Sequence, residues 1–148
     1  MAPFERILVA TDLSPCARVA LDEAALLAKR LHSRLHLLYV SEVPGVLIAD
    51  AVGLGDKFVD RDILDGRKQL DRITADLREE GIEADSEVRA GFVPDAIIEQ
   101  GQPQRYDLLV LGTHGRTGLR RLWMGSVAER VVRASTIPVL TVRPPSAL

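Results

Sequence analysis

The chain has 148 residues, of which 47% are hydrophobic and 27% are charged. This is the length of one compact domain and the composition of a folded protein, so we expect a single domain over residues 1–148 and exclude extensive disorder. The 19 Lys and Arg residues against 21 Asp and Glu residues give a net charge of −2. That balance excludes a nucleic-acid partner bound through overall charge and favours a small metabolite.

Cellular location is predicted from what the chain lacks. No apolar run approaches the roughly 18 to 20 residues needed to cross a bilayer, and the first residues lack the basic-then-apolar order of a secretory signal. The single cysteine, Cys16, excludes an internal disulfide and a multi-cysteine metal site, and fits a reducing compartment. We therefore expect a cytoplasmic protein with no membrane partner, in which Cys16 is a small buried apolar residue.

The first predicted strand covers residues 6–10, Arg-Ile-Leu-Val-Ala, a continuous apolar run typical of a strand buried on both faces. Ser14 and Pro15 then predict the start of a helix, because serine caps the first turn and proline fits the first helical position. One buried face of this helix is predicted from small and aliphatic residues at three- and four-residue steps: Ala17, Ala20, Leu21, Ala24, Leu27, Ala28 and Leu31.

The middle of the chain predicts a second strand at residues 35–40 and a third at residues 82–89, the latter alternating like a half-exposed edge strand. Residues 41–60 show no clear pattern, and so long a connection is uncommon unless it serves as a lid or contains a short helix. A helix follows, capped by Gly81, with one apolar stripe formed by Ile63, Leu70, Ile73 and Leu77.

The last third continues the alternation of helix and strand. Pro94 opens a helix, residues 107–112 form a strand that ends in glycine, residues 126–134 form a helix, and residues 138–143 form a fifth strand. The alternation predicts an α/β fold with one open, parallel, five-stranded sheet and helices on both faces.

The ligand of such a sheet lies beyond the carboxyl ends of the strands, where the strand order reverses. We predict the order 3-2-1-4-5, which makes the first and fourth strands neighbours, so that residues 10–14 and 112–126 face one cleft. The alternative order, 2-1-3-4-5, would separate them. The site prediction therefore depends on this order.

The second of these segments is rich in glycine. Its glycines can end a strand, adopt a positive φ angle or bring backbone amides close to an anion. Gly125 and Ser126 open a helix, whose free N–H groups form a second anion site. An alternative stays open, since Ser126 and Glu129 have the spacing of a capping box. The segment lacks Gly-Lys-Ser/Thr and is not a Walker P-loop.

Gly112-x2-Gly115, nine further residues and Gly125-Ser126 resemble the ATP-binding signature of the universal stress protein family, Gly-x2-Gly-x9-Gly-Ser/Thr. Residues 9–14, 112–118 and 138–142 also resemble that family, so the likeness spans nearly the whole chain apart from residues 41–60. On these motifs the chain is identified as a member of the family.

The resemblance implies an ATP site. Asp12 would bond the ribose hydroxyls, and the backbone of Ala10 and Val40 would line the adenine pocket. The phosphates would be held by Gly112, Gly115, Gly125, Ser126 and Val127. From the residues alone, Asp12 is either an acceptor for ribose hydroxyls or a turn-former ahead of Ser14 and Pro15.

Further candidates lie in the same two loops: Thr11, Thr113, His114 and Arg116. Arg116 is expected to contact phosphate, and His114 to contact phosphate or act as a base. Other arginines are predicted to form a solvated face: Arg120, Arg121, Arg130 and Arg133. His32 and His36 flank the second strand with no carboxylate partner visible in the sequence. The family resemblance allows Mg²⁺ or Mn²⁺ on the phosphates, but no carboxylate cluster identifies a protein ligand for it.

The resulting hypothesis is a cytoplasmic ATP-binding regulator of the stress response, with an unidentified regulatory protein as a partner. It would be a homodimer paired through residues 138–143, Pro-Val-Leu-Thr-Val-Arg, because an unpaired edge strand of this composition favours pairing with a second copy. One alternative is a slow ATPase or nucleotidyl transferase, against which the missing Walker lysine and acid pair count. Another is a nucleotide-free dimeric scaffold or chaperone, against which the intact glycine set counts.

Overall fold

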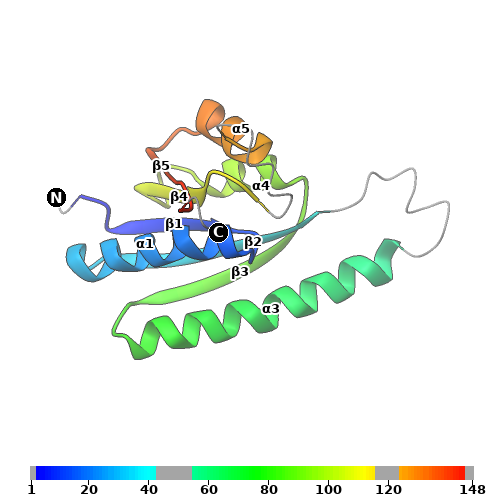
Figure 1. Cartoon of the computed structure of the whole chain (residues 1–148), viewed down its shortest axis with the longest axis horizontal. Coiled ribbons are helices and arrows are strands. Elements are labelled where there is room, and N and C mark those ends of the chain that lie inside the picture. The colour runs from blue at the N-terminus through cyan, green and yellow to red at the C-terminus, as the bar shows by residue number, and fades with distance from the viewer. Residues whose placement is uncertain (1–2, 43–54, 116–123, 146–148) are drawn as a thin grey trace.

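The computed structural model describes residues 3–42, 55–115 and 124–145, with side chains described from residue 60 onward in the second of these ranges. Its strands form one parallel sheet in the order β3-β2-β1-β4-β5 (Figure 1). The strands are β1 (Arg6–Thr11), β2 (Arg34–Glu42), β3 (Ala84–Gly91), β4 (Leu108–Gly112) and β5 (Val139–Val142). The predicted order is confirmed, and the predicted strand bounds are correct to within two residues.

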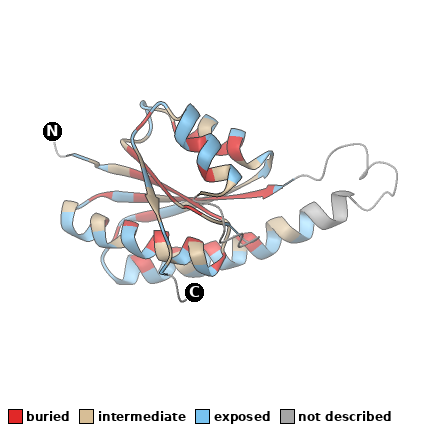
Figure 2. Cartoon of the chain, turned by 45° about the horizontal axis from the view of Figure 1, so that its top comes forward, coloured by how far each residue is buried: buried red, intermediate tan, exposed pale blue. Residues whose placement is uncertain are grey.

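Helices cover both faces of the sheet. They are α1 (Pro15–Leu31), α3 (Gly55–Glu79), α4 (Val93–Gln100) and α5 (Ser126–Ala134). Helices α1 and α3 lie on one face, while α4 and α5 lie on the other (Figure 1). Successive residues of a strand point to opposite faces, so Ile7 and Val9 belong to one buried cluster, and Leu8 and Ala10 to the other. Buried residues follow the central strands between the two helical layers (Figure 2).

Helix α1 begins as its sequence predicts. The Ala17 backbone N–H donates to Ser14 Oγ at 3.1 Å, and Pro15 occupies the first turn, where no intrahelical N–H bond is lost. Its predicted apolar face is buried at Ala17, Ala20, Leu21, Ala24 and Ala28, and half-buried at Leu27 and Leu31. The helix ends at His32, whose left-handed φ of 57° turns the chain toward β2.

Helix α3 is longer than the sequence pattern indicates. It begins at Gly55, within residues 41–60, whose sequence shows no clear pattern. Residues 43–54 lie outside the described residues. Leu70 and Leu77 of the predicted stripe are buried against the sheet. Gly81 terminates the helix as predicted, with a φ of +83° and its N–H donating to the Arg78 carbonyl oxygen at 3.0 Å.

The two edges of the sheet are β3 and β5. Most residues of β3 are half-buried, as expected for an edge strand. At the other edge, Leu140 of β5 is an exposed aliphatic residue. Among the helices described, none has the length and apolarity required of a transmembrane segment.

Candidate functional site

The predicted site residues gather where β1 and β4 end. These strands are parallel neighbours, with Ile7 paired to Leu108 and Val9 paired to Val110. Their carboxyl ends therefore lie side by side, which places the turn after Thr11 next to the loop after Gly112. The alternative order, which would have separated the two segments, is excluded.

The turn after β1 is held by its own side chains. The Leu13 N–H donates to Thr11 Oγ1 at 3.0 Å, and the Ser14 N–H donates to Asp12 Oδ1 at 2.9 Å. Leu13 itself adopts a positive φ of 64°, which is uncommon for a branched residue. Asp12 is thus a turn-former through one carboxylate oxygen, as one of the two sequence interpretations predicted.

The second carboxylate oxygen of Asp12 faces the glycine loop. A Cβ atom built on Gly115 would lie 2.9 Å from Asp12 Oδ2, closer than real Cβ contacts. The structure therefore brings the predicted ribose-binding residue and a predicted phosphate-binding glycine into direct proximity. A side chain at residue 115 would require the Asp12 carboxylate to shift.

Expected positive φ angles are not found at the described glycines of this loop. Within the described residues, the glycines with positive φ are Gly81 and Gly91, far along the chain from the motif. A positive φ angle, expected at one of the glycines of this segment, is therefore absent at Gly112, Gly115 and Gly125, while Gly118 lies outside the described residues. A Cβ on Gly125 would make a tight contact, 3.1 Å from the Thr113 carbonyl oxygen, whereas one on Gly112 would lie at ordinary van der Waals distance, 3.4 Å from the Cys16 carbonyl oxygen.

Backbone hydrogen bonds fix the loop between its neighbours. Thr113 N–H donates to the Val142 carbonyl oxygen at 3.0 Å, and Gly125 N–H donates to the Thr113 carbonyl oxygen at 2.6 Å. Thr113 Oγ1 also lies 3.0 Å from His114 Nδ1. Thr113 is therefore the point at which β4, β5 and the start of α5 meet. Arg116 lies outside the described residues.

The capping-box interpretation of Ser126 is wrong. The N-cap is Gly125, with no side-chain cap bond, and Ser126 is the first helical residue. Glu129 instead pairs with Arg133 at 2.8 Å, one turn further along. The first N–H groups of any α-helix have no intrahelical partner, so those of Ser126 and Val127 form the positive end of α5. Free N–H groups and a positive dipole end are the features by which helix N-termini bind anions in general.

Ala10 and Val40 lie at the carboxyl ends of β1 and β2, and their side chains are buried under α4 and α5. Only their backbone can therefore line a pocket at the sheet edge. No group of three or more His, Cys, Asp or Glu residues suited to a metal occurs in the parts of the chain described.

The surroundings of His36 and of Cys16 differ from what the sequence predicts. His36 has carboxylate partners after all, since Asp85 and Glu87 of the neighbouring strand β3 lie beside its ring. The strand register pairs His36 with Asp85, which lies 49 residues later in the chain. Acidic residues at alternate positions of this edge strand, Asp85 and Glu87, are the sequence signal that could have indicated the pairing. Cys16 is half-buried, so the expected burial of its side chain is only partial.

Arg130 is exposed, as predicted for a solvated face, but it is not alone. It pairs with Asp95 of α4 at 3.1 Å and lies 5.4 Å from the centroid of the Phe92 ring. Asp62 of α3 accepts hydrogen bonds from the hydroxyls of Tyr39 and Ser41. No sequence motif could have indicated these contacts, because Asp62 lies 23 residues from Tyr39 and 21 residues from Ser41.

Known proteins resemble this chain over nearly its whole length. Universal stress protein YxiE of Bacillus subtilis is 31% identical over 147 residues, covering 95% of this chain and 99% of that protein. Universal stress protein MJ0531 of Methanocaldococcus jannaschii is 30% identical over 142 residues, covering 96% and 84% respectively.

Solved structures share the fold. The universal stress protein UspA of Lactobacillus plantarum superposes with a TM-score of 0.85 at 24% identity, covering 97% of this chain and all of that one. Two more distant structures carry nucleotides: a universal stress protein in complex with cAMP, with a TM-score of 0.63 at 21% identity and coverages of 96% and 98%, and one from Archaeoglobus fulgidus in complex with dAMP, with a TM-score of 0.65 at 24% identity and coverages of 95% and 98%.

The sequence profile of the Universal stress protein family matches residues 3–143. Fold, full-length relatives and profile thus agree, and the chain belongs to the universal stress protein family.

Proposed function

We propose that this protein binds ATP across the carboxyl ends of β1 and β4. The observation that carries the proposal is the juxtaposition of Asp12 with Gly115, 2.9 Å from carboxylate oxygen to the glycine's Cβ position. It places an acidic side chain beside a loop without side chains, next to the positive end of α5. An acid for ribose hydroxyls and backbone amides for phosphates are the two halves of a nucleotide site.

Each candidate has a role in this proposal. Asp12 accepts hydrogen bonds from the ribose hydroxyls, and the backbone of Ala10 and Val40 lines the adenine pocket. The phosphates lie against the backbone of Gly112, Gly115, Gly125, Ser126 and Val127. Completing the surroundings of the nucleotide are Thr11, Thr113, His114 and Arg116.

Nucleotides bound to related proteins support the choice of ligand class. The complexes with cAMP and dAMP show that two universal stress proteins hold adenine nucleotides. The first turn of α5 and the glycine loop favour a ligand with several phosphates over a monophosphate, because two anion-binding elements converge there. A divalent metal, Mg²⁺ or Mn²⁺, fits this site only as a companion of the phosphates, consistent with the lack of a carboxylate cluster in the described residues.

The test is to identify by mass spectrometry any nucleotide that co-purifies with the protein, and then to titrate the nucleotide-free protein with ATP, dATP, AMP and cAMP. If Asp12 receives both ribose hydroxyls, wild type binds ATP more tightly than dATP, and the difference disappears in Asp12→Ala. Absence of binding to all four nucleotides would favour the scaffold or chaperone alternative.

We also propose that the protein is a cytoplasmic homodimer that regulates the stress response through a protein partner. The support for the dimer is that β5 is an edge strand with an exposed Leu140, so its open side can pair antiparallel with a second copy. Light scattering at micromolar concentration tests this. A monomer at that concentration would contradict the proposed dimer but would have no bearing on the proposed nucleotide site.

Hydrolysis of the bound ATP is proposed to be slow, far below the ~10 per second typical of enzymes. The proposal rests on the motifs, which identify neither a general base nor a transition-state arginine for phosphoryl transfer. Fast turnover that is lost in His114→Ala would contradict this and would make His114 a general base, because its ring lies in the loop beside Thr113.

A further inference from the structure

We propose that the opposite end of the sheet carries a second binding site, which takes a small anion with two or more charges. A cavity of about 550 Å³ lies at the amino ends of β1, β2 and β3, away from the nucleotide site at the carboxyl ends. A volume of this size is typical of sites for small molecules. The side chains that carry the argument are Arg6, Arg34, His36, Arg78, Arg105 and Tyr106.

The charge of the lining is positive, with four arginines against the carboxylates of Glu83 and Asp85. Two of the arginines are compensated by acids: Arg6 pairs with Asp107 at 2.8 Å, and Arg34 pairs with Glu83 at 2.7 Å. Asp85 is engaged by His36.

Arg78 and Arg105 are the exceptions. Among the described residues, neither has a carboxylate within ion-pair distance. Two guanidinium groups thus line one cavity without an acid to neutralise them, which favours an anionic ligand.

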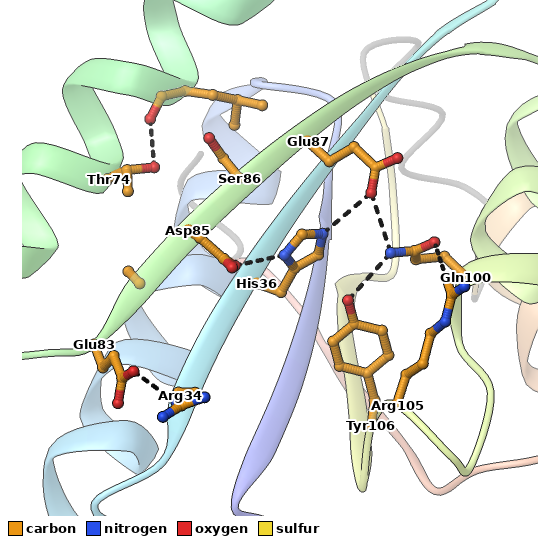
Figure 3. A network of polar contacts seen from close by, with 12 residues as sticks. Arg34, His36, Thr74, Glu83, Asp85, Ser86, Glu87, Gln100, Arg105 and Tyr106 are labelled. Atoms are coloured by element: carbon orange, nitrogen blue, oxygen red, sulfur yellow. Dashed lines mark hydrogen bonds and ion pairs between the residues drawn. The ribbon is translucent and has the colours of Figure 1, made fainter.

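Arg105 is held in place by a neutral group. Its Nη1 donates to Gln100 Oε1 at 3.1 Å, and Gln100 is only 3% exposed. The amide Nε2 of Gln100 in turn donates to the hydroxyl of Tyr106 and to Glu87, each at 3.1 Å (Figure 3). Arg105 itself is exposed, and this bond to a buried amide favours one position of its guanidinium before any ligand arrives, which lowers the entropic cost of binding.

Tyr106 adds a donor to the same wall. The centroids of its ring and the His36 ring are 5.6 Å apart. Figure 3 shows the two side chains next to each other. The hydroxyl of a tyrosine is protonated at neutral pH and can donate to an anion. The wall made by Arg105, Tyr106 and His36 therefore presents donors and no uncompensated acid.

Arg78 is fixed from a different element. It lies in the last turn of α3, and its Nε donates to the Ala84 carbonyl oxygen at 2.8 Å, where β3 begins. Two anchored cations thus reach the cavity from α3 and from the loop before β4. A ligand with two or more anionic groups engages both, whereas a monovalent anion engages one. Carboxylates and phosphates share this chemistry, so citrate and pyrophosphate are the probes.

The experiment is a titration of isotope-labelled protein with citrate, and separately with pyrophosphate, followed by backbone NMR. Saturable shifts are expected at residues 34–36, 83–85 and 105–106 in at least one arm, which also identifies the preferred anionic group. Arg105→Gln and Arg78→Gln should each weaken binding about tenfold or more, as expected for loss of a charge-assisted bond. Arg18→Gln, which removes an exposed cation paired with Asp22 on α1, is the matched control and should leave binding unchanged.

Three results would overturn the proposal: no saturable shift at the cavity in either arm, shifts confined to residues 112–115 and 125–127, or unchanged affinity in the double variant Arg78→Gln/Arg105→Gln. The second result would assign the anion to the nucleotide site. Saturating ATP should leave binding at the cavity in place. The experiments can therefore reject the proposed cavity site without rejecting the proposed nucleotide site. They can equally reject the nucleotide site without rejecting the cavity site.

Discussion

Asp12 Oδ2 lies 2.9 Å from the position that a Cβ atom of Gly115 would occupy. Residues 103 positions apart in the chain are thus in contact because β1 and β4 are neighbours in the sheet. The Asp12 side chain is short, and its other oxygen is tied to the Ser14 N–H at 2.9 Å, so it has little freedom to move aside. A side chain at residue 115 would therefore have to displace the Asp12 carboxylate.

The first prediction is that Gly115→Val weakens ATP binding at least about tenfold, or ~1.4 kcal/mol, while the domain remains folded. The added side chain displaces the Asp12 carboxylate and fills the space beside the loop backbone. Asp12→Ala alone should cost about 1–3 kcal/mol of binding free energy, the worth of charge-assisted bonds to the ribose. Isothermal titration with ATP, with circular dichroism as the fold control, gives both values.

A double-mutant cycle separates the contact of residue 115 with the Asp12 side chain from its effect on the loop backbone. If the demand for glycine comes from Asp12, Gly115→Ala should cost less in the Asp12→Ala background than in wild type. Equal costs in both backgrounds would show that residue 115 acts through the backbone alone. Wild-type affinity in folded Gly115→Val would remove the loop from the proposed site.

The strands, the helices and their succession along the chain follow from local sequence patterns. Periodicity and capping residues such as Ser14 and Gly81 act within a few residues, and the structure confirms them. The start of α3 at Gly55 was missed because residues 41–60 are rich in small residues and lack a stripe. Helix formation there is not indicated by local pattern.

The contacts within the candidate site were only partly predictable. The spacing of the glycines brought Asp12 and Gly115 to one cleft once the strand order was assumed. Gly115 does not adopt a positive φ angle, and its proximity to the Asp12 carboxylate could not be predicted, because the approach of another segment leaves no trace in the local sequence. The pairing of His36 with Asp85 depends likewise on strand register and not on any motif.

The second prediction concerns Asp62, which joins α3 to the end of β2. Its carboxylate accepts hydrogen bonds from the hydroxyls of the buried residues Tyr39 and Ser41. Asp62→Ala leaves these bonds unmade and should lower the free energy of unfolding by about 1–3 kcal/mol. Urea denaturation measures it. Asp65→Ala, an exposed position on the same helix, is the control and should stay within about 0.5 kcal/mol of wild type.

The third prediction is the direction in which Gly66→Ala changes the free energy of unfolding. Gly66 lies inside α3, where exchange for alanine ordinarily stabilises a helix by about 1 kcal/mol. Here a Cβ would lie 2.5 Å from two atoms of the Tyr39 ring, and overpacking of this kind costs about 1–3 kcal/mol. Gly66→Ala should therefore destabilise the protein in urea denaturation. In the Tyr39→Ala background the ring is gone and the same change should be stabilising; a destabilising effect there would refute the explanation.

The last prediction concerns acid stability and the ion pair that joins the starts of β1 and β4. Asp107 Oδ1 lies 2.8 Å from Arg6 Nη2, and the Arg6 backbone N–H donates to Asp107 Oδ2 at 2.9 Å. The hydrogen bond from the Arg6 side chain is the main cause that holds the pKa of Asp107 below its ordinary value of 3.8. A carboxyl group whose pKa is lowered by folding contributes stability above its unfolded pKa and loses it as pH falls through the folded pKa.

Asp107→Asn should therefore lower the free energy of unfolding by a constant amount at neutral and mildly acidic pH. The gap to wild type should narrow only below about pH 4, where the wild-type carboxylate takes up its proton. Urea denaturation from neutral pH down to the lowest pH at which both proteins fold measures the gap. Asp22→Asn, which breaks the exposed pair with Arg18, is the control and should give a small gap of about 0.3–0.5 kcal/mol. A gap at Asp107 that widens as pH falls would contradict the direction of the pKa shift and, with it, the stabilising role of Arg6.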